Sequence, residues 1–311
     1  VLLVVGGGAR ASDVLDPTRM PRAVALAEAG LRADALPTQR PNAWLALRDL
    51  LTGREDEPEA PGRPRTANPT LFEALRLLPD VSAEEVWFVD AGGAGEPGLE
   101  ASTHPAYGAS LAARVARGAG AFGEPLAGFL EQMGRPLPVA EQVWPLLRRL
   151  RDVNRRAVGP FLPGEVEQGL AEAERVERAV LQELDRKAGF VKAAHPADER
   201  AVRAALTLLA VHRPRLLVLR VCGAETAHQS IESYFAALRQ ADEALGRLQA
   251  AIAADPRLAA STALGVATEM GRNAKPDASG GLGATEESPT RRQALLLLAG
   301  PGVKPGSKPK A

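Results

Sequence analysis

Short apolar segments alternate with amphipathic helical segments along this chain, and that alternation constrains the fold more than any other feature. The apolar segments predict buried strands at residues 1–5, 85–90, 215–221, 262–268 and 294–299. The segments between them predict helices at residues 21–30, 42–51, 70–78, 197–211 and 230–254. Strands that alternate with helices form a mostly parallel central sheet with helices on both faces. We therefore predict a soluble α/β domain.

The domain organisation follows from where the strands stop. Residues 110–186 carry helical patterns without a convincing strand, so we expect a helical insertion within one domain of residues 1–303. Residues 304–311 hold three lysines among Pro and Gly, which predicts a flexible basic tail. The chain starts inside a strand, at Val1, so we expect that a preceding segment was removed or not included. Cytoplasmic and exported locations therefore both stay open.

The charge balance argues against several classes of partner. The chain has 38 basic and 38 acidic side chains, so no global field draws in DNA or RNA. No stretch approaches the ~18 apolar residues of a membrane span. We thus expect no nucleic-acid partner and no membrane span. The partner is unknown, and a protein partner stays open. Cys222 is the only cysteine, which rules out an internal disulfide and a zinc site built on cysteines.

Polar side chains follow three of the predicted strands, where a parallel sheet places its site. Glu225 and His228 follow the third strand, and they could share one cation or could cap the next helix. Glu269 and Arg272 follow the fourth strand, and they could face a ligand or could form an ion pair that fixes the loop. His104 follows the second strand in a loop with Gly and Pro, which could be functional or simply an ordered surface loop.

The turn after the first strand, Gly6-Gly7-Gly8 with Ala11, fits a loose dinucleotide-binding fingerprint. A true fingerprint also needs a helix that starts at once and an acidic residue at the end of a second strand about 20 residues on. Here Pro17 and Pro21 delay the helix, and the region around Glu28 is itself helical. A plain tight turn is the favoured interpretation, and a dinucleotide-binding protein is a distant alternative.

In their order, these segments resemble the alkaline phosphatase–sulfatase–phosphodiesterase superfamily. The resemblance rests on the strand VLLVV with its turn, the helix that ends Leu-Thr-Gly-Arg at Arg54, and the strand RLLVLRV that leads to His228 and a long helix. It also rests on Thr-Glu-Met-Gly-Arg at 268–272 and Gly-Pro-Gly-Val at 300–303. The resemblance covers nearly the whole chain except the helical block, and it implies an alkaline phosphatase-like sheet.

The resemblance also implies a nucleophile and metal ligands, and most of those positions hold other residues. Gly7 stands near the place of the family's first aspartate, and Asn42 or Ala43 at that of its nucleophile. Met270 and Ala284 stand where two histidines are expected. Neither Asn42 nor Ala43 can attack phosphorus or sulfur.

Three side chains remain of the ligand set that the resemblance implies: Glu225, His228 and Glu269. One hypothesis is a pseudoenzyme with a phosphatase-like or sulfatase-like fold that serves a binding or assembly role. The alternative is a metal-dependent hydrolase of phosphate or sulfate esters with one divalent ion, Zn, Mn, Mg or Ca, on these three ligands. In that case His104 or Arg272 would contact the anionic ester.

Overall fold

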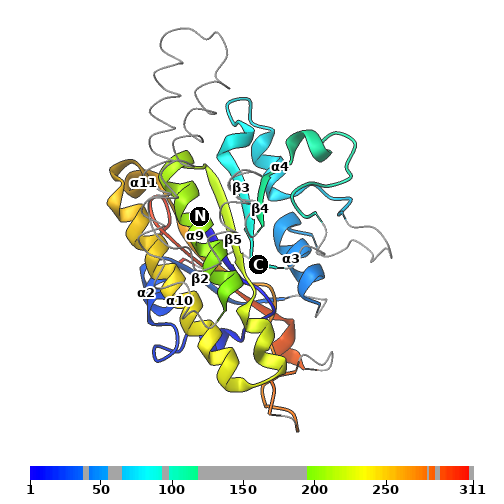
Figure 1. The fold of residues 1–311 in the computed structure, drawn as a ribbon, viewed down its shortest axis with the longest axis vertical. Coiled ribbons are helices and arrows are strands. Elements are labelled where there is room, and N and C mark those ends of the chain that lie inside the picture. The colour runs from blue at the N-terminus through cyan, green and yellow to red at the C-terminus, as the bar shows by residue number, and fades with distance from the viewer. Residues whose placement is uncertain are drawn as a thin grey trace, which may run out of the picture.

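A central sheet flanked by helices forms the centre of the computed structural model (Figure 1). The sheet has seven strands in the order β2-β7-β6-β1-β5-β3-β4. The structure describes residues 1–37, 42–54, 65–92, 98–117, 195–278, 280–283 and 288–307. The strands are β1 (Leu2–Val5), β2 (Leu31–Pro37), β3 (Val86–Asp90), β4 (Arg114–Arg117), β5 (Leu216–Val221), β6 (Leu264–Thr268) and β7 (Gln293–Ala299). The pairings from β6 through β1, β5 and β3 to β4 are parallel. The strand β7 is antiparallel to both of its neighbours, β6 and β2. The predicted mostly parallel sheet is thus confirmed.

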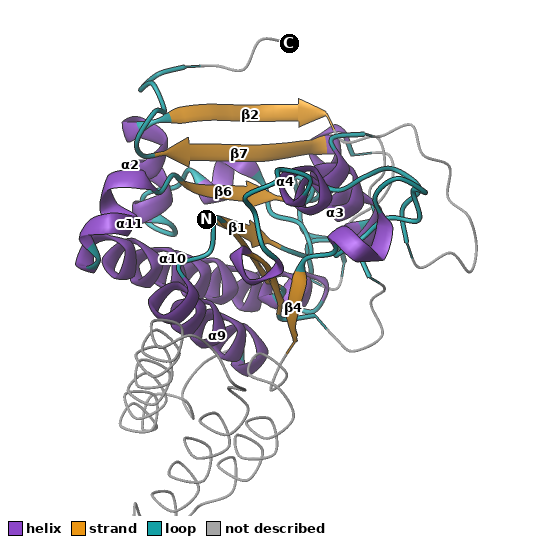
Figure 2. Cartoon of the chain, turned by 90° about the horizontal axis from the view of Figure 1, so that it is seen from above, coloured by secondary structure: helices purple, strands orange, loops and turns teal. Residues whose placement is uncertain are grey.

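Helices cover both faces of the sheet, as the sequence predicted. They are α1 (Ala11–Val14), α2 (Pro21–Ala29), α3 (Ala43–Thr52), α4 (Leu71–Arg76), α9 (Pro196–His212), α10 (Ile231–Ala254) and α11 (Pro256–Ser261). Figure 2 shows α2, α9, α10 and α11 on one side of the strands and α3 and α4 on the other. Each side has its own cluster of buried apolar side chains, so the sheet is the middle layer of three. None of the described helices is both long and apolar enough to span a membrane.

The alternation of side chains along β5 shows how the sheet serves both layers. Leu217, Leu219 and Val221 pack into the cluster under α9 and α10, whereas Val218 packs into the cluster under α3 and α4. Arg220 has the same parity as Val218, so its guanidinium lies on the α3 and α4 side, although it is fully buried. A charged side chain in a buried strand needs partners, and these partners are found at the end of the sheet.

The expected helical block needs correction at its start. Arg114–Arg117 form β4, which pairs in parallel with β3 at the edge of the sheet. The strand has four residues with arginine at both ends, too short for its pattern to stand out beside helical segments. Residues 118–194 lie outside the described part of the chain, so a helical insertion there stays a prediction.

Two further segments differ from their predictions. The strand β2 was not predicted because its sequence, LRADALP, is rich in Ala and ends on Pro, and both are poor in strands. The tail at residues 304–311 was predicted to be flexible, but Gly306 N donates a hydrogen bond of 2.8 Å to Gly30 O. Arg32 N also donates to Ser307 O at 3.4 Å, so residues 304–307 run beside the start of β2. Residues 308–311 lie outside the described residues.

Candidate functional site

The loops at the carboxyl end of the parallel strands meet around the Gly6–Gly8 turn that follows β1. Gly7 N donates a hydrogen bond of 2.8 Å to the Glu269 carboxylate, from the loop after β6. A Cβ atom on Gly7 would lie only 2.9 Å from Cδ of Glu225, from the 3₁₀ helix η5 (Gly223–His228) that follows β5. The carboxyl groups of Glu269 and Glu225 therefore both lie beside Gly7. Gly7 has φ of +80°, a conformation that favours glycine over aspartate.

Glu269 is fully buried, and its partner is Arg220 rather than Arg272. Arg220 Nε donates to the Glu269 carboxylate at 2.6 Å, and Arg220 Nη1 lies 3.4 Å from the carboxylate of Asp90 at the end of β3. Burial raises the pKa of Glu269 to about 7, against the opposing effect of the Arg220 charge. Neither Arg220 nor Asp90 was predicted as a site residue, although an arginine inside an apolar strand is a signal of a buried partner.

Arg272 is also fully buried, and its guanidinium binds backbone carbonyls instead of a ligand. Its Nε donates to Gly8 O at 3.0 Å, Nη1 to Leu282 O at 2.8 Å, and Nη2 to Ala224 O at 3.1 Å and to Gly7 O. These acceptors belong to the turn after β1, to η5 and to the loop after β6. Arg272 therefore ties three loops of the site together, and it does not form the predicted pair with Glu269.

His228 lies on the exposed side of Arg272. Its Nε2 atom is 3.3 Å from Nη1 of Arg272. A guanidinium has no acceptor, so Nε2 must be the acceptor and the ring proton belongs on Nδ1. Burial, and then the charge of Arg272, lower the pKa of His228. Neither His228 nor Glu225 caps α10, because Ser230 does so by accepting from Glu232 N and Ser233 N.

These side chains do not fit the divalent ion that the resemblance implies. The Glu269 carboxylate is already engaged by Arg220 and Gly7, and the lone pair of His228 Nε2 faces a guanidinium. A metal ion between them would face two buried positive charges. Within the described residues, no group of three or more His, Cys, Asp or Glu side chains could hold a metal ion.

The other candidate positions have structural partners of their own. His104 Nδ1 accepts from Ala106 N, and the ring packs edge-on against Tyr107 at 5.0 Å. This loop is anchored by Glu73, a fully buried carboxylate that accepts from Ser102 Oγ and Gly108 N at 2.7 Å each. The partners of His104 thus lie within its own loop.

Asn42, Ala43 and Met270, at three of the positions where the resemblance implies a nucleophile or a histidine, also have structural roles. Asn42 is the N-cap of α3, and its side chain accepts from Trp44 N at 3.0 Å and Leu45 N at 3.3 Å. Ala43 is the first residue of that helix. Met270 is buried, and a Cβ on Gly8 would lie 3.0 Å from its Cγ. Ala284 lies outside the described residues.

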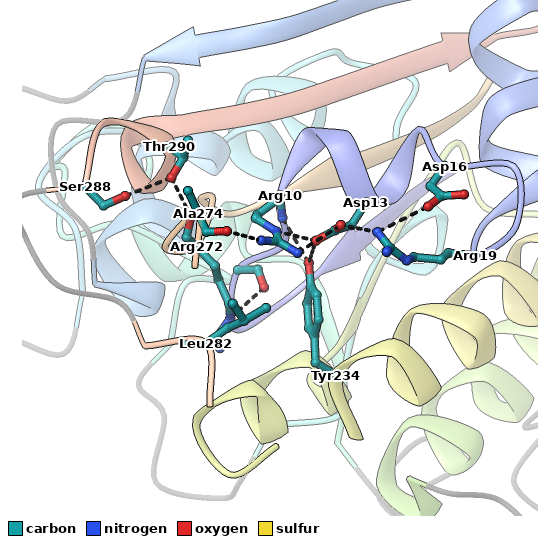
Figure 3. A network of polar contacts seen from close by, with 11 residues as sticks. Arg10, Asp13, Asp16, Arg19, Tyr234, Arg272, Ala274, Leu282, Ser288 and Thr290 are labelled. Carbon is teal, nitrogen blue, oxygen red and sulfur yellow. Dashed lines mark hydrogen bonds and ion pairs between the residues drawn. The ribbon is translucent and has the colours of Figure 1, made fainter. Parts of the chain in front are cut away.

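A polar network joins the first loop to α10 (Figure 3). Asp13 is buried and accepts from Arg10 Nε at 2.5 Å, from Tyr234 Oη at 2.9 Å and from Arg19. Arg10 also donates to Ala274 O at 2.8 Å, in the loop after β6. The glycine turn therefore leads into the short helix α1, which we had not predicted, and into an ion-pair network.

The strand order also decides against a dinucleotide site. A dinucleotide-binding fold places the second strand of the chain parallel to the first and beside it. Here β1 lies between β5 and β6, whereas β2 lies at the edge of the sheet, where it pairs with β7 and is not a neighbour of β1. The fingerprint at Gly6–Ala11 is therefore a turn without the strand that would carry the ribose-binding carboxylate.

Comparison with known proteins finds similarity among solved structures alone: no family model and no curated protein matches the chain. A protein in the alkaline phosphatase superfamily from Vibrio parahaemolyticus has a TM-score of 0.48 and 12% identity, over 99% of this chain and 61% of that one. Ps i-CgsB has a TM-score of 0.48 and 12% identity, over 99% and 67%. Phosphonoacetate hydrolase from Sinorhizobium meliloti 1021, in complex with phosphonoformate, has 0.43 and 15%, over 90% and 58%.

Proposed function

We propose that this chain is a pseudoenzyme: an α/β domain with a phosphatase-like or sulfatase-like fold that serves a binding or assembly role without hydrolysing esters. One observation carries the proposal. The polar side chains at the carboxyl end of the sheet are bonded to one another, with Glu269 on Arg220 and His228 on Arg272. Two of the three side chains predicted to hold a metal ion, Glu269 and His228, are thereby engaged within the protein.

Ester hydrolysis by this kind of fold needs a nucleophile and a positive charge aimed at the ester oxygens. Asn42 is a helix cap whose amide is not nucleophilic. Arg220 and Arg272 are two positive charges at the sheet edge, and both are fully buried. Their guanidinium donors point to carboxylates and carbonyls of the protein, so neither side chain presents its charge to a substrate.

A hydrolysis assay tests the proposal directly. The purified chain is incubated with aryl phosphate, aryl phosphodiester and aryl sulfate, with Zn, Mn, Mg or Ca supplied in turn. We expect no turnover above that of the metal and buffer alone. His228→Ala is the matched control, because His228 is the exposed imidazole of the site. Metal-dependent turnover that is lost in H228A would overturn the proposal in favour of the hydrolase with one metal ion.

A further inference from the structure

Three ionisable side chains lie in a row across the carboxyl end of the sheet. Asp90 on β3 is level with Arg220 on β5, and Glu269 directly follows Thr268 at the end of β6. The exposed fractions of the three are 2%, 0% and 1%, so all of them are removed from water. Two carboxylates here share one positive charge, at 3.4 Å and 2.6 Å.

The row passes over Gly6, the residue without a side chain that directly follows β1. A Cβ atom on Gly6 would lie 3.0 Å from Arg220 Nε and 3.2 Å from Glu269 Oε1. Gly6 therefore leaves the space through which the guanidinium reaches the carboxylate. The ion pairs thus join β3, β5 and β6 over the end of β1, and a larger residue at position 6 would obstruct them.

Burying these charges is unfavourable unless they neutralise each other. A buried carboxylate that loses its cationic partner destabilises a protein strongly, because the charge is left without compensation. A divalent cation is another way to hold carboxylates from neighbouring strand ends together. Arg220 meets the same requirement with a covalently attached charge that cannot be deprotonated.

Arg272 repeats this pattern with backbone oxygens. Its guanidinium gathers four carbonyl oxygens from three loops, as a hard cation would. The two guanidiniums cross-link the loops at this edge, beside backbone hydrogen bonds such as that from Leu282 N to Ala227 O at 2.6 Å. These contacts hold the edge together without a cation from solution.

We infer that Arg220 is a built-in substitute for a divalent cation, which neutralises Asp90 and Glu269 and makes the sheet edge stable without metal. The inference rests on the proposed function and deepens it, because it names the group that stands in for a metal ion in a protein without catalysis.

Thermal unfolding of the full chain tests the inference. The variant is Arg220→Met, and the matched control is Arg215→Met. Arg215 also binds two carboxylates, Asp80 at 2.8 Å and Glu85 at 3.0 Å, but its side chain is 43% exposed. We expect the Tm of R220M to fall by roughly 10 °C and that of R215M by about 3 °C or less.

Metal dependence is measured in the same experiment. The wild-type Tm should be the same in a chelator and in millimolar Zn, Mn, Mg or Ca. Addition of at least one of these ions should restore part of the Tm of R220M and leave R215M unchanged. A wild-type chain stabilised by a divalent ion would overturn the inference. So would an R220M chain as stable as R215M, or one that no ion stabilises.

Should R220M fail to fold, Glu269→Gln gives a milder test, because it keeps the shape of the side chain and removes one charge. We expect a lower Tm than wild type, and an unchanged Tm would overturn the inference. Failure of the inference can be told apart from failure of the proposed function. Metal binding to the wild type without turnover contradicts only the inference, whereas turnover that needs no metal contradicts only the proposed function.

Discussion

Nε2 of His228 accepts a hydrogen bond from Arg272 across 3.3 Å, and this contact joins the exposed surface of the site to its buried interior. The imidazole lies at the end of η5, whereas the guanidinium is enclosed by the carbonyls of three loops. Protonation of Nε2 would remove the acceptor and would place a second positive charge beside the first. The acid sensitivity of the fold should therefore depend on His228.

We expect His228→Gln to make the chain less sensitive to acid. The pKa of His228 is lowered from its ordinary value of 6.5, so the unfolded state binds this proton more tightly than the folded state. Stability from this group is present above pH 6.5 and is lost as the pH falls below it. The Tm of wild type should drop more than that of H228Q between about pH 7.5 and about pH 5. Parallel melting curves for the two proteins over this range would contradict the assignment.

Arg272→Lys should destabilise the chain although it keeps the charge. An ammonium group cannot reproduce the planar fork of a guanidinium, so several buried carbonyls lose their donor at ~1–3 kcal/mol each. We expect the free energy of unfolding in urea to fall by at least about 3 kcal/mol. Arg257→Lys, an exposed site on α11, is the control and should change it by less than about 0.5 kcal/mol. A loss no greater than that of R257K would show that the fork is not needed.

Asn42 should behave as a helix cap and not as a remnant of a nucleophile. Asn42→Ala removes the acceptor for Trp44 N and Leu45 N, and we expect a loss of about 0.5–2 kcal/mol in the free energy of unfolding. Asn42→Ser supplies another capping oxygen, so its stability should stay close to wild type. N42S also introduces a hydroxyl group, and it should still show no ester hydrolysis. Turnover in N42S would mean that the rest of a catalytic site is intact.

Gly6→Ala should be destabilising because of contacts and not because of backbone conformation. The added Cβ would lie 2.9 Å from Val221 O as well as close to the Arg220 and Glu269 pair. Overpacking of this kind costs typically about 1–3 kcal/mol in the free energy of unfolding. Gly53→Asn is the control, since Gly53 has φ of +65° with open space around it, and asparagine tolerates that conformation. Equal effects of the two substitutions in urea unfolding would contradict the predicted crowding at Gly6.

Local patterns were sufficient to predict the main elements of the fold. The apolar stripe of α10 and the apolar run of β5, interrupted by Arg220, are properties of the local sequence, and both elements lie where they were predicted. The two missed strands, β2 and β4, lie at the edges of the sheet. Edge strands are buried less completely than central ones, so their sequences carry a weaker pattern.

The sequence by itself determined that polar groups gather at the carboxyl end of a mostly parallel sheet, because parallel strands bring their following loops to one edge. It did not determine which charges meet there. Glu269 is three residues from Arg272 and 49 from Arg220, yet its ion pair is with Arg220. The reason is that β1 lies between β5 and β6 and is followed by Gly6, which has no side chain. The Arg220 guanidinium can therefore pass over Gly6 to reach Glu269. Strand order and that one open space are tertiary properties, and they turn Glu269, one of the candidate metal ligands, into a member of a network of buried ion pairs.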